Sequence, residues 1–177
     1  ALLPDDSDPA FGDSDASTNQ VTVLKAIDNY LDLPQVRYMY THGLEGTFPG
    51  YTSKYYPGSN RYVIMRDNYS RQAMMAQTNL SIGDGRSHTH FDNLSMIAFA
   101  YGKTLLVDNG RFNYSGTDIG DWLRYSSEAH NMITMNGLTQ GMAGDTLNHF
   151  YTSDAFDYFM GTANSTSDKT GKYPWNR

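Results

Sequence analysis

The residues best suited to chemistry in this chain are histidines and an aspartate at the ends of apolar segments. His88 and His90 stand two positions apart in the run His-Thr-His-Phe-Asp-Asn, directly before an apolar stretch. Asp108 follows the next apolar stretch, and His130 comes later in the chain. Alternate residues of an extended strand share a face, so the spacing predicts that His88 and His90 lie on one side of a strand.

Zinc is the metal that this set of side chains favours. It is bound by imidazole and carboxylate groups, and three protein ligands leave a fourth position open. A segment that turns and returns would place His90 beside Asp108, with His130 as the third ligand. The chain has no cysteine, so only His, Asp and Glu could hold a metal. From spacing alone, hydrogen-bonded histidines and an Asp108 that caps a turn remain the alternative.

Other sites built from these residue types match the sequence less well. A cupin-like site would need a glutamate shortly after the second histidine, where Leu94 and Ser95 stand. The facial triad of non-haem iron oxygenases needs a carboxylate two residues after the first histidine, where His90 stands. A Gly-x-Ser-x-Gly elbow and a phosphate-binding loop are both absent from the sequence.

Composition narrows the functional classes. The chain has 177 residues and a net charge of −6, without a run of Lys or Arg, which argues against a nucleic-acid partner. No apolar stretch reaches the length of a membrane span. The 14 tyrosines are typical of β-sandwiches and of surfaces that handle carbohydrate. Because the chain starts at Ala1 without Met, we interpret it as a fragment of a longer protein.

Two kinds of element must position these residues. The Asp-rich residues 1–20 do not have a glycine and a terminal glutamate at the spacing of a calcium loop, and they predict a solvated loop. Apolar spacing predicts helices over 21–32 and 34–42. The expected strands cover 62–66, 72–78, 93–101, 104–108, 131–136 and part of 149–160, with a tight turn at Gly102-Lys103. Strands at short, regular spacing predict an antiparallel β-sandwich, preceded by a short helical segment.

Three ordered blocks of sequence resemble the β-domain of the heparinase II/III family of polysaccharide lyases. They are residues 87–95, 100–115 and 124–131, and residues 62–67 resemble the strand that opens that domain. The early Leu3-Pro4-Asp5 and Phe11-Gly12-Asp13-Ser14 resemble the segment that closes the family's helical (α/α) toroid. The resemblance covers most of residues 1–137. It implies a helical remnant of the toroid and linker over 1–46 and an incomplete sandwich over 47–177.

The resemblance also implies an activity and a set of roles. The family cleaves acidic polysaccharides by β-elimination at a uronic acid, and its members are usually periplasmic or secreted in bacteria. His88 matches the histidine that faces the cleft. The other three matched residues, His90, Asp108 and His130, correspond to ligands of one structural zinc that braces the site.

Further residues are assigned by the same resemblance. Tyr114 and Tyr125 are candidate catalytic or sugar-stacking tyrosines, with ordinary aromatic packing as the alternative. The candidates for substrate binding are Asn93, Arg111 and Arg124. The two arginines suit this role because guanidinium groups bind carboxylate or sulfate through paired hydrogen bonds. A surface ion pair is the alternative for each arginine.

Departures from the family's pattern leave the subfamily open. Thr89 replaces a common glycine of the family's His-Gly-His, and Asn109 replaces a frequent proline. The family's toroid tyrosine has no match in this chain, so we expect the fragment to be inactive alone and to need the missing N-terminal toroid as its partner. A non-catalytic, zinc-braced sandwich module that supports or binds glycan is the second hypothesis, and a metal-dependent hydrolase or oxygenase the third.

Overall fold

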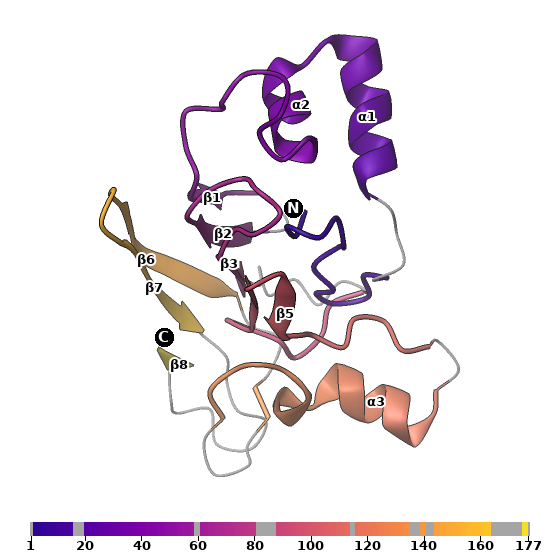
Figure 1. The fold of residues 1–177 in the computed structure, drawn as a ribbon. Helices are drawn as coiled ribbons and strands as arrows, with labels where there is room; N and C mark the ends of the chain where they lie inside the picture. The colour runs from indigo at the N-terminus through magenta and orange to yellow at the C-terminus, as the bar shows by residue number, and fades with distance from the viewer. Residues whose placement is uncertain are drawn as a thin grey trace.

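Two antiparallel sheets follow a pair of helices in the chain (Figure 1). The structure is a computed structural model that describes residues 2–15, 20–58, 61–80, 88–113, 116–134, 139–140, 144–163 and 175–176. The helical pair lies at one end of the molecule, above the sheets in the view of Figure 1. The predicted fold class, an antiparallel β-sandwich preceded by a short helical segment, is confirmed.

The helical pair is held together by a buried carboxylate. Helix α1 spans Gln20–Leu31 and α2 spans Pro34–Tyr40, close to the predicted bounds. Asp28 of α1 is 1% exposed. It accepts hydrogen bonds from Arg37 Nε at 2.9 Å and from the Tyr40 hydroxyl at 2.7 Å. A charged group in the interior needs partners of this kind, so the contacts fix α2 against α1.

The first sheet has five strands in sequence order, each antiparallel to its neighbour. They are β1 Lys54–Tyr56, β2 Arg61–Arg66, β3 Met75–Leu80, β4 Met96–Ala100 and β5 Lys103–Leu106. Neighbouring residues of β2 face opposite ways: Val63 packs with Leu80 on one side, and Ile64 packs with Phe99 on the other. The sheet therefore has an apolar core on both faces.

The turn between β4 and β5 differs by one residue from the prediction. Its two central residues are Tyr101 and Gly102, with φ of 56° and 72°, and Lys103 already belongs to β5. Two-residue hairpin turns of this kind need positive φ at both positions. The hairpin itself is confirmed, and it brings the segment before β4 and the segment after β5 to the same end of the sheet.

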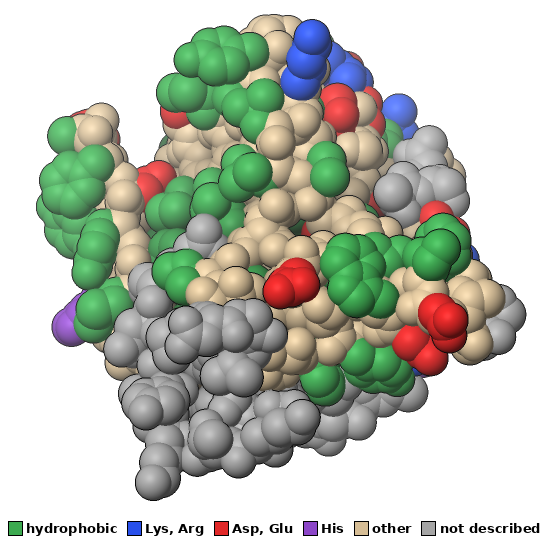
Figure 2. Space-filling view, turned by 90° about the horizontal axis from the view of Figure 1, so that it is seen from below, with side chains coloured by type: hydrophobic (Ala, Val, Ile, Leu, Met, Phe, Trp, Pro, Cys, Tyr) green, Lys and Arg blue, Asp and Glu red, His purple; other side chains and the backbone are tan. Residues whose placement is uncertain are grey.

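The second sheet has the order β6, β7, β8 in the described part of the chain. β6 spans Asp145–Thr152, β7 spans Asp157–Ala163 and β8 spans Trp175–Asn176. The predicted aromatic strand within 149–160 is therefore a hairpin of two strands. Apolar side chains from β6 and β7 pack against the Val63 and Leu80 side of the first sheet. Exposed aromatic residues of this hairpin are Tyr151, Phe156 and Tyr158. Figure 2 shows a group of hydrophobic side chains on the projection at its left.

A short helix was missed by the sequence analysis. Helix α3 spans Asp118–Tyr125, and its N-cap Thr117 accepts a hydrogen bond from the Gly120 amide at 3.2 Å. A threonine cap followed by acidic residues is a usual helix start, so the signal was present. The predicted strand 131–136 is wrong over 131–134, which are not extended in a sheet, and 135–136 lie outside the described residues.

Two further expectations concern the ends of the helical segment. The predicted solvated loop over residues 1–20 is wrong for part of its described residues, because Leu3 and Phe11 are buried against the first sheet. The domain boundary at residue 46 stays a prediction. Among the helices in the described residues, none has the length and apolar content that a membrane crossing requires.

Candidate metal centre and adjoining surface

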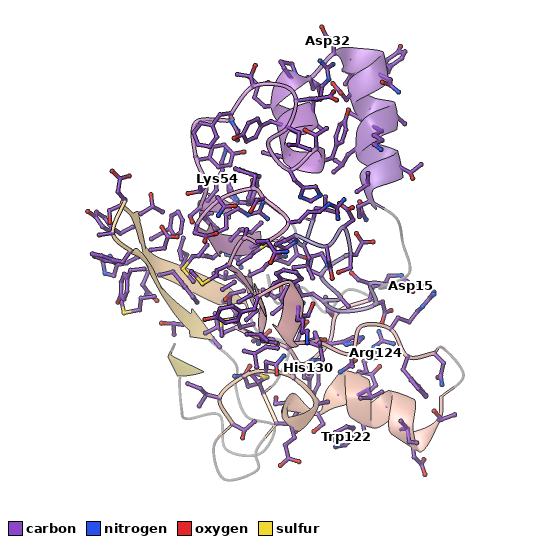
Figure 3. The ribbon with its side chains drawn as sticks, in the orientation of Figure 1. Asp15, Asp32, Lys54, Trp122, Arg124 and His130 are labelled. Carbon is purple, nitrogen blue, oxygen red and sulfur yellow. The ribbon has the colours of Figure 1, made fainter. Side chains whose placement is uncertain are left out.

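Three of the predicted site residues meet in the interior. His90, Asp108 and His130 are each less than 9% exposed, and one ligand atom from each lies within 4.8 Å of the others. His90 precedes β4, Asp108 follows β5, and His130 follows the short 3-10 helix Ser127–Ala129, called η1. The β4–β5 hairpin brings the first two together, as the sequence analysis expected. Figure 3 shows His130 below the sheet, near α3.

Hydrogen bonds hold the carboxylate of this cluster in place. His130 Nδ1 lies 2.9 Å from Asp108 Oδ2, and Ser95 Oγ donates to the same oxygen at 3.1 Å. Burial opposes a charge on His130, yet the hydrogen bond and the charge of Asp108 outweigh it and raise the histidine's pKa. Asp108 is thus a carboxylate with two side-chain partners, an arrangement that orients a ligand.

His90 is oriented by a residue that sequence reasoning did not assign to the site. Its Nε2 lies 2.9 Å from Oδ1 of Asp13. Burial lowers the pKa of His90, with help from the nearby His130, so the ring is favoured in its neutral form. A neutral imidazole that donates Nε2–H to Asp13 leaves Nδ1 as its lone-pair atom. Metal-binding histidines are usually held by a carboxylate in this way.

Two buried ring nitrogens support the metal interpretation. His90 Nδ1 and His130 Nε2 have no hydrogen-bond partner although they are shielded from solvent. Buried polar atoms are nearly always satisfied, so such atoms need an explanation. Two imidazoles and a carboxylate are a donor set that zinc accepts. The residues present therefore fit a metal ion.

Asp13 also contacts the predicted cleft histidine. His88 is 64% exposed on its side chain, and its Nδ1 lies 2.8 Å from Asp13 Oδ2. The expectation that His88 and His90 share a face of a strand is wrong. Neither lies in a strand, and His88 has a φ of 88°. The rings of His88 and His90 both contact the carboxylate of Asp13. Both residues precede strand β4, which starts only at Met96.

The main chain around Asp13 explains why this approach is possible. The amide of Asp13 donates to the carbonyl of His88 at 3.1 Å. Gly12 has a φ of 56°, and a side-chain carbon there would lie 2.6 Å from that carbonyl oxygen. Only glycine combines this backbone conformation with so close an approach. The Phe11-Gly12-Asp13 segment resembled the family, but nothing in its own spacing indicated a contact 75 residues away.

A second acidic residue missed by sequence reasoning lies beside the cluster. Asp92 is 2% exposed, and its Oδ2 has no hydrogen-bond partner. Burial, together with the charge of Asp108, raises its pKa to about 7, against the opposing effect of His130. A carboxyl group in such surroundings exchanges its proton near neutral pH. The motif His-Phe-Asp offered a signal, since Asp92 follows His90 by two positions.

The two predicted substrate arginines have different partners. Arg111 Nη2 forms an ion pair with Asp15 at 2.8 Å, which is the surface alternative foreseen for it. Arg124 of α3 stands over the ring of Tyr125 at 5.2 Å from Cζ to centroid. In Figure 3 the Arg124 label lies between α3 and the segment that carries Asp15. The charge of Arg124 also helps to lower the pKa of Asp13, against its burial.

The remaining candidates have different surroundings. Tyr125 is 42% exposed and packs edge-on against Phe91, with ring centroids 5.5 Å apart. Asn93 is fully buried, so in this conformation its side chain cannot contact a glycan, which corrects the role predicted for it. Tyr114 lies outside the described residues. The site that remains is a buried three-residue cluster joined through Asp13 to an exposed histidine, with a half-exposed tyrosine and Arg124 nearby.

Comparisons with known proteins identify the family and the fold that this chain resembles. A family model described as heparinase II/III-like, C-terminal, matches residues 51–157. A curated heparin-sulfate lyase of Bacteroides stercoris is 28% identical over 145 residues, which are 76% of this chain and 21% of that protein. The heparan sulfate lyase HepC of Pedobacter heparinus superposes with a TM-score of 0.82 at 23% identity, over 93% of this chain and 26% of that one.

Another solved structure shows the same fold. A heparinase III crystal structure superposes with a TM-score of 0.75 at 21% identity, over 92% of this chain and 28% of its own. This chain therefore spans about a fifth of the curated relative and about a quarter of the solved structures it matches.

Proposed function

The chain belongs to the heparinase II/III-like family, in the part described as C-terminal, and from this membership we propose that it is part of a polysaccharide lyase. The lyase would cleave uronic-acid-containing glycans, of the heparan sulfate type or related to it, by β-elimination. The printed names of the relatives supply the substrate class. One observation connects the proposal with particular residues. Asp13 contacts both the exposed His88 and the buried His90, which belongs to the cluster with Asp108 and His130.

The reaction defines what the cleft must provide. A base removes the proton from C5 of the uronate, a double bond forms between C4 and C5, and the glycosidic oxygen leaves from C4 with a proton. His88 is the described residue placed to exchange protons with a bound sugar, since its ring is exposed while Asp13 fixes its direction. Asp13 is a hydrogen-bond acceptor for Nδ1–H, so Nε2 of His88 is the atom that faces substrate.

Charge stabilisation comes from neighbouring groups. The uronate carboxylate becomes more electron-rich as C5 loses its proton, and a nearby cation lowers the energy of that state. We assign this role to Arg124, whose guanidinium lies over Tyr125. Tyr125 would stack on sugar or pass a proton to the leaving oxygen, and Arg111 would bind an acidic group once released from Asp15.

The metal we propose is one zinc per chain, held by His90, Asp108 and His130. Bound there, zinc would supply a fixed positive charge that braces the ends of these segments. His90 then holds Asp13 in place, and Asp13 orients His88. The zinc would therefore influence the direction of the His88 ring through these two hydrogen bonds. The role is structural, and the proton transfers remain with the protein's own side chains.

The whole lyase would need its N-terminal toroid, which the family resemblance supplies as the second wall of the cleft. We expect the present chain to be inactive alone, and we expect the parent protein to be periplasmic or secreted. The second candidate function is a zinc-braced module that supports or binds glycan without catalysis. It is favoured by the exposed aromatic residues of the β6–β7 hairpin.

Metal analysis of the purified chain tests the site. We expect about one zinc per chain, lost in His90→Ala and retained in His149→Ala, which removes an exposed histidine of β6. A full-length parent carrying His88→Ala tests the reaction. It should keep its zinc and release unsaturated uronate about 10²–10⁴-fold more slowly. Undiminished cleavage by that variant would refute the role of His88, and a zinc-free wild-type chain would refute the metal site.

A further inference from the structure

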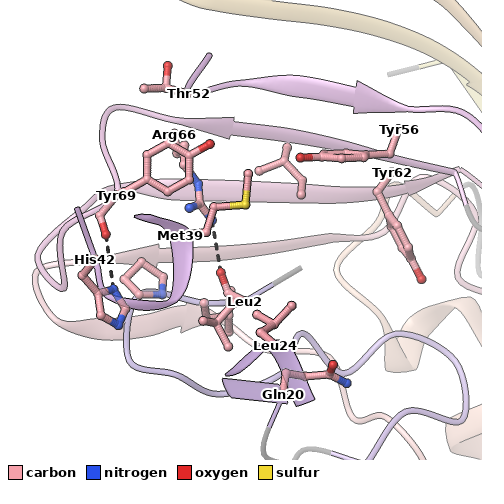
Figure 4. A pocket seen from close by; sticks show the side chains of 13 residues that line it. Leu2, Gln20, Leu24, Met39, His42, Thr52, Tyr56, Tyr62, Arg66 and Tyr69 are labelled. Carbon is pink, nitrogen blue, oxygen red and sulfur yellow. Dashed lines mark hydrogen bonds between the residues drawn. The ribbon is translucent and has the colours of Figure 1, made fainter. Parts of the chain in front are cut away.

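A separate cavity lies between the helical pair and the first sheet. It has a volume of about 380 Å³ and is drawn in Figure 4. Its walls come from the N-terminal segment, both helices and strands β1 and β2, and most are apolar: Leu2, Leu24, Met39, Tyr56, Tyr62 and Ile64. It shares no lining residue with the metal cluster. Its volume lies in the range of about 300–1,000 Å³ that is usual for small-molecule sites.

The guanidinium of Arg66 lines this mostly apolar cavity. Arg66 Nη2 donates to the carbonyl oxygen of Leu2 at 3.1 Å and contacts Sδ of Met75 at 2.8 Å. Its Cζ lies 4.8 Å from the centroid of the Tyr69 ring. Figure 4 shows the guanidinium of Arg66 among these groups, between Tyr69 and Leu2. All of these partners are neutral.

Arg66 has no ion pair with any residue that the structure describes, and its Nε is buried without an acceptor. Burial lowers its pKa, with only a partial opposing effect from the tyrosines and from Asp67. Arg37 shows the contrast, because its partners Asp28 and Asp32 raise its pKa. Taking a cation out of water is costly unless an anion compensates it. The cavity therefore contains a positive group that forms no ion pair with a carboxylate among the described residues.

We propose that this cavity is a binding site for a small aromatic carboxylate. The carboxylate forms a charge-assisted hydrogen bond with Arg66, and the ring occupies the space lined by Leu24, Met39 and the tyrosines. A uronate sugar also carries a carboxylate on a ring, but its hydroxyl groups would lose their water partners against these apolar walls. The chemistry of the cavity thus selects an aromatic acid over a sugar acid.

Titration calorimetry on the full 177-residue chain tests the proposal, with benzoate, phenylacetate, benzyl alcohol and glucuronate as probes. We expect saturable binding of one of the two aromatic acids, and binding at least about tenfold weaker for the neutral alcohol. Glucuronate should not bind at this cavity. Equal binding of acid and alcohol, or tighter binding of glucuronate through Arg66, would overturn the assignment.

Variants identify the residue responsible. Arg66→Gln should weaken binding of the acid at least about tenfold and leave the thermal midpoint of the free chain unchanged or higher, because a poorly compensated cation is removed. Arg71→Gln removes an exposed arginine from the turn after β2 and should leave binding unchanged. Leu24→Phe keeps the cation and narrows the cavity, so it should also abolish binding. Unchanged binding in both Arg66→Gln and Leu24→Phe would refute the site.

Discussion

The carboxylate of Asp13 lies 2.8 Å from Nδ1 of His88, although 75 positions separate the two residues in the chain. The other oxygen of the same carboxylate lies 2.9 Å from the buried His90. One side chain therefore connects the exposed histidine with the metal cluster. Because one carboxylate contacts both rings, we expect a displacement of the cluster to change the direction of the exposed ring.

Replacing Asp13 by asparagine tests this connection. The amide is nearly the same size but carries no charge, so it holds His90 less firmly and makes the ring a weaker ligand. We expect the affinity for zinc to fall about 10–100-fold, as for other carboxylates behind metal-binding histidines. Competition with a chelator measures the affinity. Asp15→Asn is the matched control, since Asp15 pairs with Arg111 and should leave zinc affinity unchanged. Equal loss in both variants would contradict the prediction.

Gly12→Ala should disturb the same contact through the main chain. A side-chain carbon at residue 12 would lie 2.6 Å from the carbonyl oxygen of His88, and the positive φ adds further strain. We expect a thermal midpoint several degrees lower and weaker zinc binding. Gly50→Ala separates the two causes, because Gly50 also has a positive φ but no atom within 4 Å of the added carbon. The contact with His88 is unimportant if the two variants behave alike.

The sequence predicted the two helices, the β4–β5 hairpin and the joining of His90 with Asp108, since each follows from local periodicity and a short turn. Helix α3 was missed, although Thr117 caps it and Ile119, Trp122 and Leu123 stand at helical spacing. The aromatic stretch after His149 was not divided into two strands, because both are similar in composition. Local patterns of this kind determine single elements and leave their boundaries open.

The role of Asp13 could not be predicted in the same way. Its partners lie far away in sequence, and an Asp-rich segment is more often solvated than buried. The burial of Phe11 brings that segment against the first sheet and Asp13 with it, which is a consequence of packing. Asn93 shows the opposite error. The sequence motif suggested that its amide binds substrate, but the fold buries the side chain completely.

A cavity in the core beneath the N-terminal segment should strongly lower the free energy of unfolding. Phe99 is 1% exposed and packs with Leu3, Phe11 and Ile97. Phe99→Ala should lower the free energy of unfolding by about 3–5 kcal/mol, through lost burial and the space left behind. Leu105→Ala, on the exposed side of β5, should change it by less than about 0.5 kcal/mol. Chemical denaturation measures both, and similar losses would mean that β4 is not a core strand.

The helical pair should lose stability in acid. Hydrogen bonds from Arg37 and Tyr40 lower the pKa of Asp28 below that of an unfolded chain. A lowered folded-state pKa gives a contribution that is present above the unfolded value of about 3.9 and is lost as the pH falls through the folded value. We therefore expect Asp28→Asn to be less stable than wild type at pH ~7, and the difference to shrink steadily below pH ~4. Urea unfolding across this range measures it, with Asp32→Asn, an exposed neighbour on the same arginine, as control. A difference independent of pH would show that the charge of Asp28 does not stabilise the pair.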